Sequence, residues 1–327
     1  MMIELSLVHL RFDVTTTTPL NLAGHLAGNN LRNGLASIML YATCPETERR
    51  SKPTPEHAAS CPACWLLAAE LEPGTVARGY ALVPPQPPRY RLEAGESFSF
   101  VVTLFGSELT FLPYIVLAVS ELGERGVGPG RGCFAIERIF AVQPLAGMQQ
   151  LLWQRGESVV ITPDLLIGAD EVAGQVALLE DRVGAELTLE FLSPLRLEED
   201  GRQLKTPDFS VLFRRLLYRI DELNRQFADQ MRRDSQEVAY LYQLADQVRL
   251  VEAETRWHEL WSNSSRKHDK TPLSGLTGRA VYRSRDWRPL LPWLVWGQAV
   301  QVGKAVTKGN GTYQIVAPAG TAYWSWL

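Results

Sequence analysis

One pattern of proline and glycine occurs twice, with identical spacing, in this chain of 327 residues. Pro113 is followed nineteen residues later by Gly132, and Pro292 is followed nineteen residues later by Gly311. Each proline follows a leucine at the head of an apolar segment, and each glycine ends a Gly-x-Gly triplet that leads into a short alternating segment. A helix, a glycine-rich turn and a strand, used twice, indicate an internal duplication of one small module.

The periodicity of apolar residues predicts the same order of elements in both halves, with an insertion in the second half. The first half predicts strands at 2–14, 79–83, 98–105 and 133–142 and helices at 21–39 and 111–122. The second half predicts strands at 187–197, 278–283 and 312–316, and helices at 207–227, from 235 towards 261, and over most of 287–302. This β-α-β-β-α-β order predicts the α+β class, with tandem ferredoxin-like (RRM-like) modules and a C-terminal glycine-rich loop.

The expected domain organisation has three parts. Residues 1–145 form an N-terminal ferredoxin-like module with a cysteine-containing loop at 44–64, residues 146–183 form a linker with short strands, and residues 184–327 form the C-terminal module. Helices cover one face of each sheet in this plan, so we expect the other sheet faces to be free and to line a cleft between the modules.

Composition excludes several classes of protein. At 46% hydrophobic and 21% charged residues, the chain is neither disordered nor fibrous. It contains no apolar run long enough for a membrane span, and its first residues lack the features of a signal peptide, so we expect a cytoplasmic protein without a membrane partner. A Walker loop, a Gly-x-Ser-x-Gly elbow and a dinucleotide fingerprint are absent from the sequence, which disfavours a kinase, a hydrolase of that type or a dehydrogenase.

Charge is distributed unevenly along the chain. The net charge is -3, yet residues 256–308 hold ten basic and three acidic side chains. A local basic surface on an acidic chain indicates an anionic ligand, and RNA is the first partner to consider. A solvated charged face explains the same counts equally well.

Three segments together resemble a known family. Residues 302–313 read Val-Gly-Lys-Ala-Val-Thr-Lys-Gly-Asn-Gly-Thr-Tyr, residues 261–267 and 273–278 form a serine-arginine segment followed by a glycine-rich strand entry, and residues 112–132 form the matching first-half segment. In these segments the chain resembles the CRISPR-associated endoribonucleases that cut repeat RNA into guides, within the RAMP superfamily.

The resemblance implies a metal-independent endoribonuclease that needs no cofactor for catalysis. Its substrate would be CRISPR repeat RNA, and its products would carry a 2′,3′-cyclic phosphate and a 5′-hydroxyl. The alternative within the superfamily is a non-catalytic subunit that holds the guide RNA beside other CRISPR effector subunits. A third interpretation is a scaffold for protein interactions that is stabilised by a structural zinc ion.

His25 is the candidate catalytic histidine, because the family often places one in the first helix or in the loop after it. Imidazole titrates near neutral pH and suits proton transfer at the 2′-hydroxyl or at the leaving oxygen. Arg32 lies seven residues further on, two helical turns away, and Lys304 lies in the glycine-rich loop, so both are expected to stabilise phosphate charge. A partly buried structural histidine is the alternative for His25.

The predicted RNA-binding residues are Arg266, Lys267, His268, Gly303, Lys308, Gly309 and Gly311. Glycine allows positive φ and lets backbone N–H groups approach a phosphate closely, while the cations add salt-sensitive attraction. A plain helix-to-strand turn is the alternative for the glycines, and simple exposure for His268. His258 is expected to pack within a helix, and His9 to be structural on a strand.

Cys44, His57, Cys61 and Cys64 could together hold a structural zinc ion. Three thiolates and an imidazole complete a tetrahedral zinc site, and the segment around them lacks a core of its own. Free thiols in a reducing cytosol are the alternative. The zinc would cross-link the loop and would take no part in catalysis.

Overall fold

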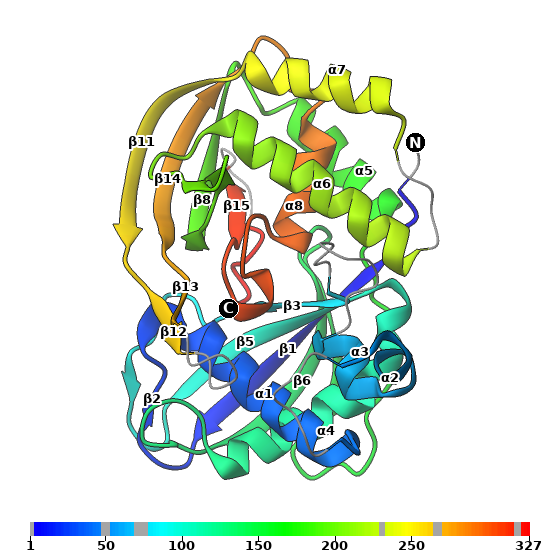
Figure 1. The fold of residues 1–327 in the computed structure, drawn as a ribbon, viewed down its shortest axis with the longest axis vertical. Helices are drawn as coiled ribbons and strands as arrows, with labels where there is room; N and C mark the ends of the chain where they lie inside the picture. Colours follow the sequence, from blue (N-terminus) through cyan, green and yellow to red (C-terminus); the bar gives the residue numbers. More distant parts are fainter. Residues whose placement is uncertain (1–2, 47–52, 69–77, 229–232, 264–269, 317–321) are drawn as a thin grey trace.

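The computed structural model describes residues 3–46, 53–68, 78–228, 233–263, 270–316 and 322–327. Figure 1 shows two modules, each with one sheet, stacked along the long axis of the molecule. The first module occupies the lower half of this view and the second module the upper half.

The first module follows the predicted order of elements. Its main strands are β1 (Leu7–Thr16), β3 (Tyr80–Val83), β5 (Ser97–Phe105), β6 (Phe134–Gln143) and β7 (Met148–Gln154). Its helices are α1 (Ala27–Thr43), α2 (Pro55–Ser60), α3 (Pro62–Ala68) and α4 (Leu112–Arg125), and its small elements are β2 (Leu20–Asn21), β4 (Arg91–Leu92) and the 3₁₀ turns η1 (Gly24–Leu26) and η2 (Gly106–Phe111). The strands pair antiparallel in the order β3-β5-β1-β6-β7.

The second module repeats the arrangement. Its sheet has the order β11-β14-β8-β15, formed by β8 (Glu186–Leu195), β11 (Arg249–His258), β14 (Gly275–Arg283) and β15 (Tyr313–Val316). Its helices are α5 (Ala169–Glu180), α6 (Phe209–Phe227), α7 (Ser235–Asp246) and α8 (Leu291–Val300), with η3 (Val306–Lys308) in the glycine-rich loop. Two small ribbons, β9 (Glu198–Glu199) with β10 (Arg202–Gln203) and β12 (Trp261–Asn263) with β13 (Lys270–Pro272), complete it.

The duplication predicted from the sequence is present in the fold. Within each module the four main strands, numbered in chain order, lie in the order 2-3-1-4, which is the ferredoxin-like arrangement. Helices α4 and α8 both begin with the Leu-Pro pair, because proline is compatible with the first turn of a helix. After each helix a matching contact closes the turn, from Val127 N to Gly132 O at 2.9 Å and from Val302 N to Gly311 O at 3.0 Å.

The sheet of the first module is buried on both faces at β3 and β5. Alternate residues of these strands enter different cores, since successive side chains of a strand point to opposite faces. Ala81, Val83, Val101 and Phe105 join the core of the second module, whereas Tyr80, Leu82, Val102 and Leu104 join the core beneath α1 and α4. The expectation of a free sheet face is therefore wrong here, because the second module covers it.

One predicted helix is wrong in its second half. Helix α7 ends at Asp246, and the residues up to His258, expected to be helical, form strand β11. This strand is largely exposed, and it pairs with β14 from Arg249↔Arg283 to His258↔Gly275. Its Glu, Ala and Leu residues favour a helix locally, but the backbone pairing with β14 overrides that preference.

The start of the first helix also differs from the prediction. Strand β2 pairs with β4 at Leu20↔Leu92, and Ala23 and Gly24 adopt φ values of 60° and 59°. Helix α1 therefore begins at Ala27, and His25 lies in η1 just before it.

The segment 44–64, expected to be a loop, contains α2 and the beginning of α3 within its described residues. The hydroxyl of Thr54 caps α2 by accepting a hydrogen bond from His57 N at 3.2 Å. None of the helices that the structure describes combines the length and the apolar character that a membrane span requires.

Replacing Phe105 tests whether the two modules share a core. Phe105→Ala should lower the free energy of unfolding by about 3–5 kcal/mol, because it leaves a cavity where β5 meets the second module. The matched control is Leu117→Ala on α4, whose side chain is 69% exposed and whose loss should change stability by less than about 0.5 kcal/mol. Equal effects in denaturant unfolding would contradict the shared core.

Candidate functional site

The glycine-rich loop of the second module contacts the first turn of α1 backbone to backbone. A Cβ placed on Gly28 would lie 2.5 Å from Lys308 O and 2.8 Å from the Cα of Gly309. Gly309 has φ +88° and would in turn place a Cβ 3.0 Å from the Cα of Gly28. Only glycine at both positions permits this approach, which brings the start of α1 against the second module.

Two histidines from different modules meet beside this contact. The rings of His25 in η1 and His258 at the end of β11 have centroids 4.1 Å apart and are tilted by 53°. His258 Nε2 is 2.7 Å from Thr277 Oγ1 on the neighbouring strand β14, which holds the ring in place. Sequence reasoning missed His258, because it placed the residue in a helix. The position of His258 beside His25 follows only from the pairing of β11 with β14, which the sequence did not predict.

Burial and nearby charge shift both imidazoles of the free protein towards the neutral form. Burial, His258 and Arg256 lower the pKa of His25 to about 4. Burial, followed by Arg256, also lowers the pKa of His258. A neutral imidazole can accept a proton, so the pair is equipped for acid–base chemistry.

A buried polar contact joins α1 to the β12–β13 ribbon. Ser262 Oγ and Asn29 Oδ1 lie 2.9 Å apart, and both side chains are buried. Figure 1 shows this ribbon beside the start of α1. The contact fixes the ribbon, and with it the end of β11, relative to His25.

Two cations lie close to each other where α1 meets the glycine-rich loop. Burial, then the positive charge of Arg32, lowers the pKa of Lys308. Arg32 Nε donates to Tyr80 Oη at 3.4 Å and its Nη1 to Asn33 Oδ1 at 3.4 Å. Within the described part of the chain neither cation forms an ion pair with a carboxylate, so the two like charges favour binding of an anion.

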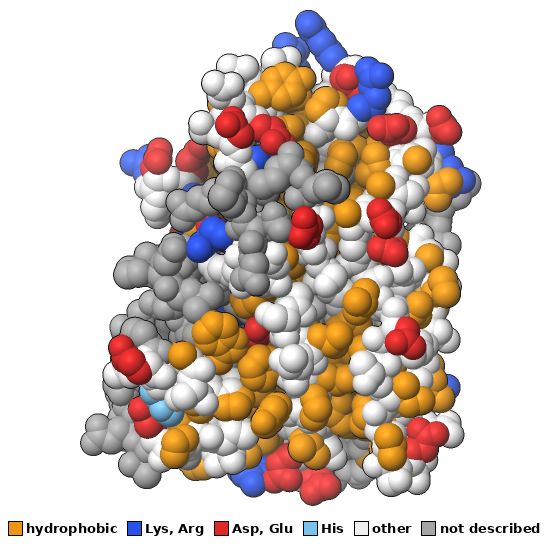
Figure 2. All heavy atoms as spheres, turned by 90° about the vertical axis from the view of Figure 1, so that its right-hand side faces the viewer, with side chains coloured by type: hydrophobic (Ala, Val, Ile, Leu, Met, Phe, Trp, Pro, Cys, Tyr) orange, Lys and Arg blue, Asp and Glu red, His pale blue; other side chains and the backbone are white. Residues whose placement is uncertain are grey.

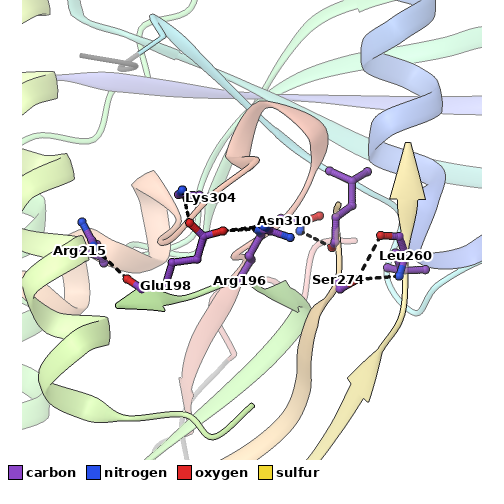
Figure 3. A network of polar contacts seen from close by, with 8 residues as sticks. Arg196, Glu198, Arg215, Leu260, Ser274, Lys304 and Asn310 are labelled. Carbon is purple, nitrogen blue, oxygen red and sulfur yellow. Dashed lines mark hydrogen bonds and ion pairs between the residues drawn. The ribbon is translucent and has the colours of Figure 1, made fainter. Parts of the chain in front are cut away.

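Lys304, predicted to act with His25, points elsewhere. Its ammonium forms an ion pair with Glu198, which also accepts from Arg196 Nε at 3.1 Å (Figure 3). Burial raises the pKa of Glu198, but the hydrogen bonds from Lys304 and Arg196 outweigh it and lower the pKa overall. On the other side of the loop, Asn310 Nδ2 donates to Leu273 O at 2.9 Å (Figure 3). The structure thus brings Lys308, rather than Lys304, to the side of Arg32.

The loop glycines have packing partners inside the protein. Gly303 has φ +87°, and a Cβ there would lie 2.6 Å from Arg196 O. Gly311 has φ +78°, and a Cβ would lie 1.8 Å from Val302 O. These contacts explain the glycines without a ligand, so their predicted role in RNA binding stays a prediction. Arg266, Lys267 and His268 lie outside the described residues.

The four predicted metal ligands converge. The ligand atoms of Cys44, His57, Cys61 and Cys64 all lie within 4.8 Å of one another. Cys44 Sγ is 3.4 Å from His57 Nε2 and 3.7 Å from Cys64 Sγ. Zinc bonds of about 2.3 Å to sulfur and about 2.0 Å to nitrogen, in a tetrahedron, require separations of about 3.5–3.8 Å between ligand atoms. The chemistry and the spacing of these donors both fit zinc.

The surroundings of this cluster support the fit. His57 Nδ1 is 3.4 Å from Glu46 Oε1, the carboxylate–histidine contact that orients imidazole ligands. Burial, followed by hydrogen bonds with Cys44 and Cys61, raises the pKa of Cys64 to about 12. Without a metal the Cys64 thiol is therefore protonated, and zinc would have to displace its proton.

The face shown in Figure 2 is a poor place for an anion. Hydrophobic side chains gather over its lower half, where the first module lies, and Lys and Arg side chains are sparse there. The cations of the candidate site belong instead to the junction of α1 with the glycine-rich loop and β11.

Comparisons with known proteins agree with this architecture. Residues 189–313 match the family model of the CRISPR-associated endoribonuclease Cas6, and residues 5–165 match a model described as an N-terminal domain. Among solved structures, a Thermus thermophilus Cas6 gives a TM-score of 0.56 at 13% identity, over 95% of this chain and 99% of that one. A Cas6 product complex gives a TM-score of 0.55 at 15% identity, over 95% and 100%. A partial Cas6–RT–Cas1–Cas2 complex gives 0.61 at 14%, over 98% of this chain and 48% of that chain.

A search among curated proteins found no match. The tandem ferredoxin-like modules with a glycine-rich loop are the fold of these Cas6 structures. Residues 189–313 therefore match a CRISPR-associated endoribonuclease domain of the Cas6 type, and this match together with the fold supports an endoribonuclease.

A substitution at Gly28 tests the contact between α1 and the glycine-rich loop. Gly28→Ala should lower the free energy of unfolding by about 1–3 kcal/mol, because its methyl group meets the backbone of Lys308. The matched control is Gly174→Ala in α5, where a Cβ would have no atom within 4 Å. This control should be neutral or stabilising by up to about 1 kcal/mol, since alanine favours a helix. Equal stability of the two variants in denaturant unfolding would contradict the close approach.

Proposed function

We propose that the chain is a metal-independent endoribonuclease that cuts CRISPR repeat RNA in the cytoplasm. Its products would end in a 2′,3′-cyclic phosphate and a 5′-hydroxyl. The observation that carries the proposal is the contact of Gly28 with the glycine-rich loop, because Lys308 of this loop lies beside Arg32 while His25 lies in η1, three residues before Gly28. Imidazole, guanidinium and ammonium are the groups that RNA cleavage by the 2′-hydroxyl requires.

Each residue has a distinct task in this proposal. His25 transfers a proton at the reacting oxygens, for which a neutral imidazole is suited. Arg32 and Lys308 hold the scissile phosphate and offset the negative charge that grows as the 2′-oxygen attacks. Lys304 would contribute only on leaving Glu198, and Arg266, Lys267 and His268 remain predicted contacts to the RNA backbone.

The names of the structural relatives support the proposed partners. They include a Cas6 product complex and a Cas6–RT–Cas1–Cas2 complex. We therefore propose repeat RNA as the substrate and other CRISPR proteins as further partners of this chain.

Cleavage of the repeat RNA in EDTA tests the reaction. The protein should cut its own repeat once, and a 2′-deoxy substitution at the scissile position should abolish the cut, because it removes the nucleophile. His25→Ala should slow the cut by about 10²–10⁴-fold with RNA affinity unchanged. Tight binding without any cleavage would instead support a subunit that only holds the guide RNA.

We further propose that Cys44, His57, Cys61 and Cys64 hold one structural zinc ion. When bound, the ion would supply a tetrahedral cross-link between the end of α1 and helices α2 and α3. The cluster has its own buried surroundings, and none of its residues takes part in the proposed reaction.

Metal analysis of purified protein tests the zinc site. The parent should contain one zinc per chain, and Cys64→Ser should lose it and melt at a lower temperature, because folding and binding are coupled. The matched control is Cys133→Ser, a cysteine outside the cluster whose thiol contacts Glu124 O at 3.3 Å. Zinc well below one per chain in the parent, or equal loss in both variants, would contradict the site.

A further inference from the structure

The sequence points to one catalytic histidine, but the fold supplies a second one opposite it. Cleavage by a 2′-hydroxyl needs one group to remove its proton and another to protonate the departing 5′-oxygen. A single imidazole cannot reach both oxygens at once, because the attacking 2′-oxygen and the leaving 5′-oxygen lie on opposite sides of the phosphorus. The proposed function therefore requires a partner for His25.

His258 is placed to be this partner. Its ring lies 4.1 Å from that of His25, centroid to centroid, and comes from the other module. Its Nε2 is engaged by Thr277 Oγ1 at 2.7 Å, which leaves Nδ1 as the nitrogen that can face a substrate. The pair thus presents two imidazoles, one from each module, to one point where the modules meet.

The surroundings of the two rings differ. Thr277 Oγ1 lies 2.7 Å from His258 Nε2, and its hydroxyl oxygen can accept a hydrogen bond from that nitrogen. A protonated His258 can therefore keep one N–H on Thr277 and turn the other towards a substrate. A bound phosphate would favour this protonated form, because its negative charge stabilises the imidazolium.

We propose that His258 is a second catalytic residue, the general acid that protonates the 5′-oxygen while His25 acts as the general base. This inference rests on the proposed function. Thr277 supports His258 in this role, since its hydroxyl oxygen can accept a hydrogen bond from the protonated Nε2 of His258.

The step conserves protons and bonds. His25 takes the proton of the 2′-hydroxyl, and the 2′-oxygen forms a bond to phosphorus. The bond from phosphorus to the 5′-oxygen breaks, and His258 gives its proton to that oxygen. The products are a 2′,3′-cyclic phosphate and a 5′-hydroxyl, and solvent returns the proton from His25 to His258.

A substrate with sulfur in place of the bridging 5′-oxygen separates the two roles. A thiolate leaves without being protonated, so this RNA needs a base but no acid. His258→Ala should cut normal repeat RNA about 10²–10⁴-fold more slowly and should cut the sulfur-containing RNA within about threefold of the parent. His25→Ala should stay slow on both substrates.

Two further measurements keep the test decisive. His258→Gln retains a hydrogen-bonding side chain beside Thr277 but carries no proton to donate, so it should be as slow as His258→Ala on normal RNA. RNA affinity and melting temperature of both variants should match the parent. A fast His258→Gln, or no rescue by the sulfur substitution, would reduce His258 to a positioning residue and overturn the proposal.

The outcome is separable from that of the proposed function. A parent that cuts RNA in a 2′-hydroxyl-dependent manner, together with a His258→Ala variant of equal rate, overturns this inference alone. Rescue of His25→Ala instead of His258→Ala also overturns it, because the roles would be exchanged. A parent that cuts neither substrate overturns both proposals.

Discussion

The approach of Gly28 to Lys308 and Gly309 is the contact on which the rest of the structure depends. A side chain at Gly28 would collide with the loop backbone, so the helix start and the loop can touch only without one. This approach places His25 beside His258 and lets Ser262 meet Asn29. Buried hydrogen bonds reinforce it elsewhere along the junction, including Gln301 Nε2 to Leu82 O at 3.0 Å and Leu5 N to Asn224 Oδ1 at 3.0 Å. The candidate site is therefore a property of two modules held together, and neither module contains it alone.

Four of the ten cations between residues 256 and 308 form ion pairs within the protein. Arg279, Arg283, Arg288 and Lys304 pair with Glu190, Glu186, Asp286 and Glu198, respectively. Exposed ion pairs of this kind add little stability, but they lower the charge available to a ligand. What distinguishes the site is burial combined with a lack of described counter-charges, as at Lys308 beside Arg32. A count of charges along the sequence cannot separate these two groups of cations.

Local patterns predicted most of the fold. The repeated Leu-Pro and Gly-x-Gly pattern correctly predicted α4 and α8, the turns that follow them and the duplicated ferredoxin-like order. The sequence predicted helix α6 because its apolar residues recur at helical spacing, and these residues are buried along one face of the helix. The prediction failed at β11, where Leu250, Ala253 and the two glutamates favour a helix while the backbone pairs with β14. That error removed His258, the neighbour of His25, from consideration.

The sequence by itself determined the elements, the duplication and the residue types of the site, since proline, glycine and apolar spacing act within a few residues of one another. It also brought the ligand set Cys44, His57, Cys61 and Cys64 into view, because a short segment limits how far these side chains can separate. The tertiary structure alone decided which cation stands beside Arg32 and which histidine faces His25. Those choices depend on strand register and on the meeting of two glycines 281 residues apart, Gly28 and Gly309. No local pattern encodes such a contact, because it is selected by the packing of whole modules against each other.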